Sequence, residues 1–131
     1  MEQVDFYKHK LAYEIDSWDL HEAQKSGAKV VVLDVRQEDS YNKLHIKGAI
    51  SYPHKNIVAE NRADFNQDTL YVTYCDGLGC NAATAGAMKM AELGFTVKEL
   101  IGGLTWWRDH NYPTEVTEQQ TSADTLSAVA N

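Results

Sequence analysis

The sequence lacks the long hydrophobic stretches and the leader pattern that mark membrane or secreted proteins. No apolar run among its 131 residues approaches the roughly 20 residues that a membrane-spanning helix needs. The first residues, 1–5, show no basic segment followed by an apolar one, which is the pattern of a secretory signal. We therefore expect a cytoplasmic protein that does not partner a membrane.

Basic residues are also scarce. The chain has 12 Lys and Arg against 19 Asp and Glu, which gives a formal net charge of −7, and its basic residues form no cluster. Such a field repels polyanions, including nucleic acids and anionic lipid surfaces. The sequence thus predicts no nucleic-acid partner, and it leaves the oligomeric state open.

Cysteine is limited to Cys75 and Cys80. A disulfide framework needs more cysteines and an oxidising compartment, so a structural bridge is a weak interpretation. A zinc site is weaker still, because the chain has no Cys-x-x-Cys motif or closely spaced His pair to complete a four-ligand set. We expect no metal and no cofactor. The cysteines are then either inert buried thiols or include a reactive one.

The first part of the chain alternates between strand and helix patterns. Residues 1–12 form a lead-in, either a short helix or a loose segment, and 13–15 form a brief strand. Ser17 is expected to cap a helix that stops at Gly27. The β-branched run over 30–35 is typical of a strand buried on both faces of a parallel sheet.

The same alternation continues to the end of the folded part. The patterns predict a short helix over 37–43, a short strand ending at Pro53, a loop with some helix over 56–68, a strong strand over 70–74, a helix from Asn81 to Gly94, a strand over 97–101 and a last helical turn with Trp106 and Trp107. This order predicts one α/β domain over 13–113, whose mainly parallel central sheet has helices on both faces. The polar residues 114–131 have little to bury and are expected to form a mobile tail.

The segment with the clearest chemistry is the junction of strand 70–74, Cys75 and the next helix. Ligands of open parallel sheets bind beyond the carboxyl ends of the strands, where Cys75 lies. The helix N-terminus and the curl allowed by Gly77 and Gly79 favour an anion there. A thiol in this place should ionise more readily than a free one, and the thiolate is the nucleophile. The alternative is an inert buried cysteine with a packing role.

Three motifs, in this order, resemble the signatures of the rhodanese homology domain. They are Leu33-Asp34-Val35-Arg36 with His45-Ile46-Lys47-Gly48-Ala49-Ile50, then Tyr74-Cys75 with its turn and helix, then Gly102-Gly103 with Trp106-Trp107. The resemblance implies a three-layer fold and a sulfurtransferase that carries a persulfide on Cys75. It implies that the substrate loop consists of Asp76, Gly77, Leu78, Gly79, Cys80 and Asn81. It also implies that Asp34 and Arg36 form a buried structural brace.

The loop departs from the family at two positions. Common members have an arginine where this chain has Cys80, and that arginine helps to bind an anionic donor such as thiosulfate. Asp76 places a carboxylate next to the thiol, which raises the cost of a second negative charge. Thiosulfate is therefore not the expected donor. The resemblance leaves the small sulfur donor, and the thiol or protein acceptor, unspecified.

Cys80 has three interpretations: a small buried residue at the helix start, a resolving thiol that attacks a persulfide or sulfenate on Cys75, or a metal ligand. A disulfide would require the two Cα atoms to lie within roughly 7 Å. Two histidines, His45 and His54, lie in or near these motifs. We expect His45 to satisfy backbone groups near a turn rather than act as a base, and His54 to line the pocket.

Four functions follow from these alternatives. The first is transfer of a sulfane sulfur to a thiol or another nucleophile through a Cys75 persulfide. The second is a non-catalytic binding or regulatory module, and the third is a redox switch that uses Cys75 and Cys80. The fourth, a cysteine phosphatase or arsenate reductase, is disfavoured because Asn81 stands where an arginine would clamp the phosphoryl oxygens.

Overall fold

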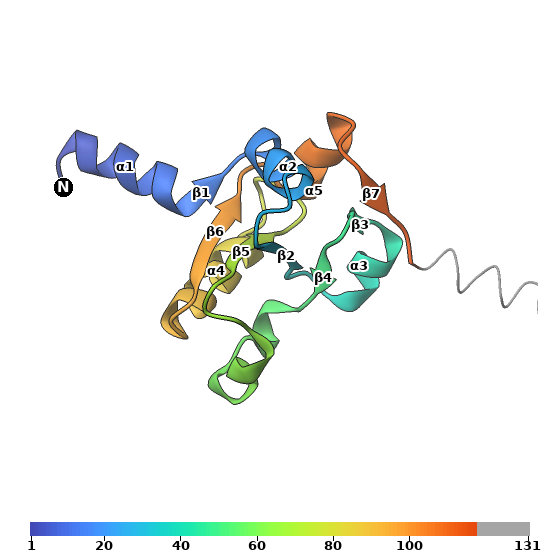
Figure 1. Ribbon diagram of the computed structural model, residues 1–131. Coiled ribbons are helices and arrows are strands. Elements are labelled where there is room, and N and C mark those ends of the chain that lie inside the picture. Colours follow the sequence, from blue (N-terminus) through green and yellow to red (C-terminus); the bar gives the residue numbers. More distant parts are fainter. Residues whose placement is uncertain (118–131) are drawn as a thin grey trace, which may run out of the picture.

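A five-stranded parallel sheet forms the centre of the structure, a computed structural model that describes residues 1–117 (Figure 1). The strand order is β1-β6-β5-β2-β4, and each neighbouring pair is parallel. The strands are β1 Glu14–Ile15, β2 Val30–Asp34, β4 Ile50–Ser51, β5 Leu70–Tyr74 and β6 Thr96–Leu100. The predicted α/β fold with a mainly parallel sheet is confirmed.

Two hydrophobic cores lie on opposite faces of the sheet, because successive side chains of a strand point to opposite sides. On one face, Val32 and Val72 pack with Leu20 of helix α2 (Ser17–Lys25) and Trp107 of helix α5 (Gly103–Asp109). On the other face the core consists chiefly of Leu33, Tyr71, Phe65, Phe95, Ala83 and Met90, of which the last two belong to helix α4 (Ala82–Glu92). Helices therefore cover both faces.

The start of α2 differs from the prediction. Asp16, rather than Ser17, is the N-cap: its Oδ1 accepts a hydrogen bond of 2.8 Å from the backbone N–H of Asp19. Ser17 is the first helical residue and is buried. Both residue types are good caps, and the sequence alone does not distinguish two adjacent candidates.

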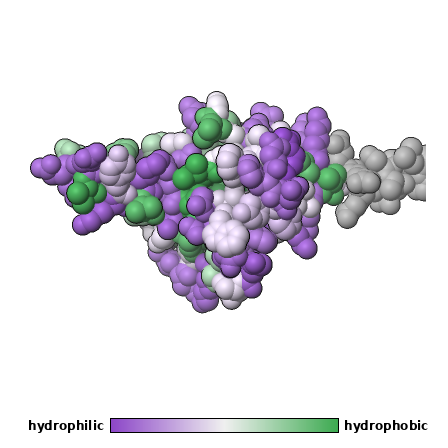
Figure 2. All heavy atoms as spheres, turned by 90° about the horizontal axis from the view of Figure 1, so that it is seen from above, coloured by the Kyte–Doolittle hydropathy of each residue, from purple (hydrophilic) through white to green (hydrophobic). Residues whose placement is uncertain are grey.

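The N-terminal segment is a full helix, α1, over Gln3–Tyr13. It buries none of its side chains and extends from one end of the molecule, with apolar side chains scattered among polar ones (Figures 1 and 2). The expected lead-in therefore has regular structure, although it adds nothing to either core. Of the helices in residues 1–117, none combines the length and apolar character that crossing a bilayer requires.

Short elements connect the main ones. They are α3 (Glu38–Lys43), β3 (His45–Ile46), two 3₁₀ turns, η1 (His54–Asn56) and η2 (Ala59–Asp64), and β7 (Thr114–Glu115).

The expected tail at 114 is wrong at its start, because β7 pairs antiparallel with β3, with Ile46 opposite Thr114 and His45 opposite Glu115. Polar composition conceals this pairing, which uses backbone groups. The remainder of the predicted tail, 118–131, lies outside the described residues.

Candidate functional site

Cys75 lies directly after β5, at the carboxyl edge of the sheet and between the ends of β2 and β6. Its side chain is buried, with 4% of the residue's surface exposed. The loop over 76–81 then leads into α4, and its tip, Leu78, is 87% exposed. The nucleophile predicted from sequence is thus placed under a loop that is itself open to solvent.

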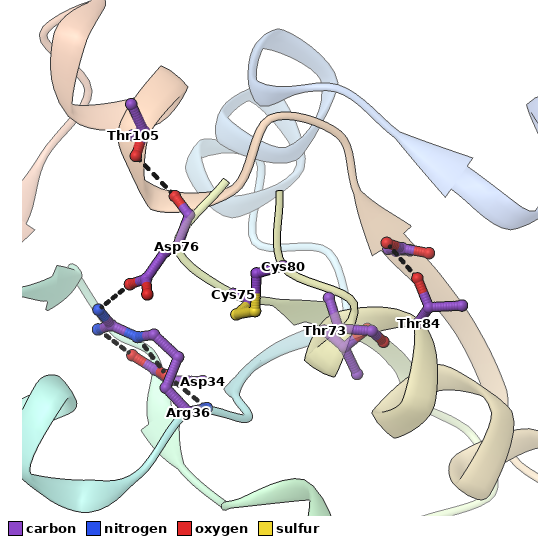
Figure 3. Close-up of a disulfide and its surroundings, with 10 residues drawn as sticks. Asp34, Arg36, Thr73, Cys75, Asp76, Cys80, Thr84 and Thr105 are labelled. Atoms are coloured by element: carbon purple, nitrogen blue, oxygen red, sulfur yellow. Dashed lines mark hydrogen bonds and ion pairs between the residues drawn. A yellow bond between two sulfur atoms is a disulfide. The ribbon is translucent and has the colours of Figure 1, made fainter. Parts of the chain in front are cut away.

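The two cysteines of the chain are joined by a disulfide (Figure 3). Their Cα atoms are 6.3 Å apart, within the range that a bridge requires. A turn in which the N–H of Cys80 donates to the carbonyl of Gly77, at 3.2 Å, brings the ends of the loop together. The sequence disfavours a structural bridge, whereas the interpretation of Cys80 as a resolving thiol requires that the two sulfur atoms can join, as they do here. A cysteine count does not reveal how a loop folds back on itself.

Carbonyl groups at the start of the loop accept hydrogen bonds from α5, whereas several N–H groups of the loop have no protein acceptor in the described structure. The carbonyl of Cys75 accepts from the N–H of Leu104 at 2.9 Å, and that of Asp76 accepts from the N–H and the Oγ1 of Thr105, each at 2.8 Å. By contrast, the backbone N–H groups of residues 77–79 donate to no protein acceptor within residues 1–117. Three successive donors without protein acceptors, in the loop that follows Cys75, suit the binding of an anion.

The close approach of α5 to this loop requires glycine at position 103. Gly103 has a φ of +58°, and a Cβ atom there would lie 2.5 Å from the carbonyl oxygen of Cys75. The pair Gly102-Gly103, which carried part of the family resemblance, thus lets the start of α5 hold the loop by its carbonyls.

Asp34 and Arg36 form a buried ion pair next to the site. Arg36 donates from Nε to Oδ1 of Asp34 at 2.9 Å and from Nη2 to Oδ2 at 2.7 Å. The hydroxyl of Tyr74 donates to the same Oδ2 at 2.6 Å and accepts from the N–H of Ile46 at 3.1 Å. Burial, together with the charge of Asp34, raises the pKa of Tyr74 far above its ordinary value, so the hydroxyl stays a donor. We call Asp34, Arg36 and Tyr74 the brace.

The brace also reaches the loop over 76–81. Nη1 of Arg36 donates to Oδ1 of Asp76 at 2.9 Å, and the two side chains point toward one another in Figure 3. Burial would lower the pKa of Arg36, but the hydrogen bond and charge of Asp34 and the hydrogen bond to Asp76 raise it overall, so the guanidinium stays charged. The sequence predicts that the carboxylate of Asp76 opposes a negative charge on Cys75. In the structure this carboxylate is paired, which reduces its opposition to a thiolate.

Cys75 lines two separate cavities. One, of about 420 Å³, lies between the loop and the segment formed by α1, β1 and β6, and its wall includes Lys10, Glu14 and Glu99. The other, of about 320 Å³, lies on the side of Arg36 and His54. The sulfur is therefore approachable from two sides of the loop.

Sequence reasoning missed the three charged residues on the wall of the first cavity. Glu14 and Glu99 are neighbours because β1 pairs with β6 in the register that places them side by side. Lys10 donates to Glu14 at 2.7 Å, and Thr84 donates to Glu99 at 2.9 Å. The only signal was that both glutamates sit in predicted strands, and strand order cannot be obtained from that alone.

The two histidines lie apart. His45 is buried, its Nδ1 lies 2.7 Å from the carbonyl oxygen of Tyr41, and its ring stacks on that tyrosine, so it belongs to the packing. His54 lines the second cavity with Nδ1 3.1 Å from Nζ of Lys89. Burial and the charges of Lys89 and Lys55 lower the pKa of His54, which favours the neutral ring. Within residues 1–117, no three His, Cys, Asp or Glu side chains gather as metal ligands.

Comparisons with known proteins agree with this geometry. The model of the rhodanese-like domain matches residues 17–110. A solved protein of Bacillus halodurans is 42% identical, with a TM-score of 0.82, over 87% of this chain and 84% of that one. An HTH-type transcriptional regulator of Mycobacterium tuberculosis is 30% identical over 70% of this chain and 40% of its own length.

A thiosulfate sulfurtransferase of Pseudomonas aeruginosa shares the fold, with a TM-score of 0.71 at 20% identity, over 84% of this chain and 21% of that one. The chain spans less than half the length of the curated relatives it matches. A family model that covers most of the chain, together with these relatives, establishes the family. The chain belongs to the rhodanese-like domain family.

Proposed function

We propose that the protein is a sulfurtransferase that carries a sulfane sulfur as a persulfide on Cys75. The main support for this proposal is the loop over 76–81. Three successive N–H groups there lack acceptors in the described structure, while the neighbouring carbonyls are held by α5. Amides fixed in this way stabilise an anionic sulfur without reorganising. The family and the fold of the thiosulfate sulfurtransferase neighbour support the assignment.

The cycle begins with reduction, because the disulfide occupies Cys75. Two equivalents of a thiol reduce the bridge and leave as their own disulfide. The Cys75 thiolate then attacks the outer sulfur of a donor persulfide, and the donor thiolate departs with the electron pair of the broken S–S bond. An acceptor thiolate attacks the outer sulfur in turn and restores the Cys75 thiolate. We assign this cycle to the cytoplasm, where thiols are kept reduced.

The charges on the wall of the larger cavity favour a donor that is less anionic than thiosulfate. Glu14 and Glu99 face the larger cavity, and the ammonium of Lys10 is already paired with Glu14. Arg36 is committed to Asp34 and Asp76. Because no unpaired cation lines this cavity within the described chain, we propose the persulfide of a small thiol as the donor and a thiol, free or on a protein, as the acceptor.

The test uses two variants, to keep the two cysteines distinct. Reduced Cys80→Ser and the double variant Cys75→Ser/Cys80→Ser are incubated separately with cysteine persulfide, thiosulfate and mercaptopyruvate, and each intact mass is measured. We expect Cys80→Ser to gain one sulfur atom, most readily from the persulfide, and the double variant to gain none. Equal gain by both variants, or none by either with any donor, would refute transfer through Cys75.

The disulfide itself favours a second candidate, a redox switch that closes in response to an oxidant. The two functions differ in their product. A switch forms the bridge from mild peroxide with no sulfur donor present, and it does not change the sulfur content of any substrate. A protein that forms the bridge with peroxide but takes up no sulfur in the test above would be a switch.

A further inference from the structure

We propose that Cys80 is an internal acceptor: its thiolate attacks the Cys75 persulfide, releases the carried sulfur as hydrosulfide and closes the disulfide seen in the structure. This inference rests on the proposed function and adds to it an activity, the reduction of a persulfide to hydrosulfide. It starts from the observation that the bridge joins the nucleophile to the only other cysteine of the chain.

The position of Cys80 suits a thiolate. It stands two residues before α4, whose N-cap, Asn81, makes no side-chain capping bond and whose first turn carries no acidic residue. Cys80 therefore lies close to the positive end of that helix, whose first turn carries no competing side-chain anion. A thiol at a helix N-terminus ionises more readily, and the thiolate is the attacking form.

Access also favours the internal thiol. Cys75 is only 4% exposed, whereas Cys80 is already within bonding distance of it. An external acceptor must enter one of the two cavities and displace water before it reaches the sulfur. An intramolecular nucleophile in position has a large advantage over a dilute external one, because its translational freedom is already lost.

The chemistry balances with one named co-reactant. The Cys80 thiolate attacks the Sγ of Cys75 in Cys75–S–SH, and the bond between Sγ and the outer sulfur breaks. The outer sulfur leaves as HS⁻ with the electron pair of that bond. It is thereby reduced, and the two protein thiols are oxidised to the disulfide. Two small thiols, or one dithiol protein, then reduce the bridge. In sum, RSSH and two R′SH give RSH, H₂S and R′SSR′.

The sequence of steps gives the disulfide a defined place: it is the form of the protein after each release and before each reduction. A simple sulfurtransferase with an external acceptor would never pass through it. Cys80→Ser is therefore expected to store sulfur, and the unaltered protein to discharge it.

The experiment follows sulfur and hydrogen in one turnover. Reduced protein, freed from reductant under anaerobic conditions, receives one equivalent of cysteine persulfide, and hydrosulfide and intact mass are measured together. We expect the unaltered chain to release about one hydrosulfide per chain, from the stoichiometry above, and to lose two hydrogens without retaining sulfur. Cys80→Ser should retain one sulfur on Cys75 and release hydrosulfide at least about tenfold more slowly, because only external thiols remain.

Two controls separate the possible failures. Ala85→Ser alters the first turn of α4 but keeps both thiols, so it should behave as the unaltered chain. Cys75→Ser should release no hydrosulfide, which excludes direct attack by Cys80 on the donor. If the unaltered chain retains its sulfur, or Cys80→Ser releases hydrosulfide equally fast, the internal-acceptor proposal is wrong while sulfur transfer stands. If Cys80→Ser takes up sulfur from none of cysteine persulfide, thiosulfate and mercaptopyruvate, both proposals fall.

Discussion

The ends of two neighbouring strands, β2 and β5, have opposite characters. Asp34 and Tyr74 are opposite each other in the strand register, so the brace and the loop over 76–81 start from adjacent points of the sheet. In the brace, the carboxylate and guanidinium are paired and buried. In the loop, N–H groups of 77–79 lack protein acceptors and the tip is exposed. Satisfied polar groups stabilise the fold, whereas unsatisfied donors mark the place for an incoming anion.

The two regions are nevertheless connected through Arg36, which is bonded to Asp34 on one side and to Asp76 on the other. We therefore expect changes in the brace to alter mainly the free energy of unfolding, and changes in the loop to alter mainly the sulfur chemistry.

The largest expected effect belongs to the loop. Cys75→Ser should reduce sulfur uptake by at least about 1,000-fold, because a serine hydroxyl does not replace the thiolate nucleophile. The measurement is the rate of persulfide consumption by reduced protein, with urea unfolding as the companion. The separation of roles is broken if the same variant loses as much stability as the brace variant described next.

The largest effect on stability belongs to the brace. Asp34→Ala leaves the buried guanidinium of Arg36 without its main partner, and we expect a loss of about 3–5 kcal/mol in the free energy of unfolding. The matched control is Asp68→Ala, which removes the exposed ion pair with Lys29 and should leave the urea midpoint unchanged. Equal shifts in the two variants would contradict the role given to the brace.

Tyr74→Phe tests the hydrogen bonds made by the tyrosine of the brace. It removes one donor to Asp34 and leaves the N–H of Ile46 without its acceptor, which should cost about 1–3 kcal/mol. Tyr52→Phe removes a single bond, at 2.8 Å, to the carboxylate of Asp64 near the surface and should cost clearly less. Thermal unfolding of the two variants side by side is the check. A larger loss in Tyr52→Phe would disprove the ranking.

Gly103→Ala tests how α5 holds the loop. Backbone strain at positive φ should cost about 1–3 kcal/mol, and the new Cβ would also press on the carbonyl of Cys75. Gly27→Ala is the matched control, since its φ is +77° but a Cβ there meets nothing within 4 Å. Both should lose stability, and only Gly103→Ala should slow sulfur uptake. Equal uptake rates would mean that the loop tolerates displacement.

The smallest effect is expected from Asp76→Asn. Its carboxylate is 67% exposed, so loss of the ion pair with Arg36 should change stability by less than about 1 kcal/mol. Removing a negative charge next to Cys75 favours the thiolate, so the alkylation rate of reduced Cys80→Ser/Asp76→Asn should rise at lower pH than that of Cys80→Ser. Asp39→Asn in the same background should leave the profile in place. A shift toward higher pH would reverse the electrostatic argument.

Much of the fold around the site could be predicted from the sequence. The β-branched run over 30–35 and the apolar run over 70–74 gave both central strands to within a residue, and the end of the second placed Cys75 at the sheet edge. Such runs are informative because strands buried on both faces consist mainly of apolar residues.

The remainder depends on contacts between distant segments. The partner of Asp76 comes from the end of a different strand, and the neighbourhood of Glu14 and Glu99 depends on strand order and register. The bridge depends on how the loop turns, and β7 depends on backbone pairing rather than on side-chain composition. None of these leaves a periodic signal along the chain.

Helix α1 contributes a charge to the larger cavity beside Cys75. It buries no side chain, so no core packing fixes its direction, yet it places the ammonium of Lys10 on the wall of the larger cavity beside Cys75. The charges on the wall of that cavity thus depend in part on a helix that buries no side chain. A change in the direction of α1 would therefore move this ammonium relative to Cys75 while leaving both cores in place.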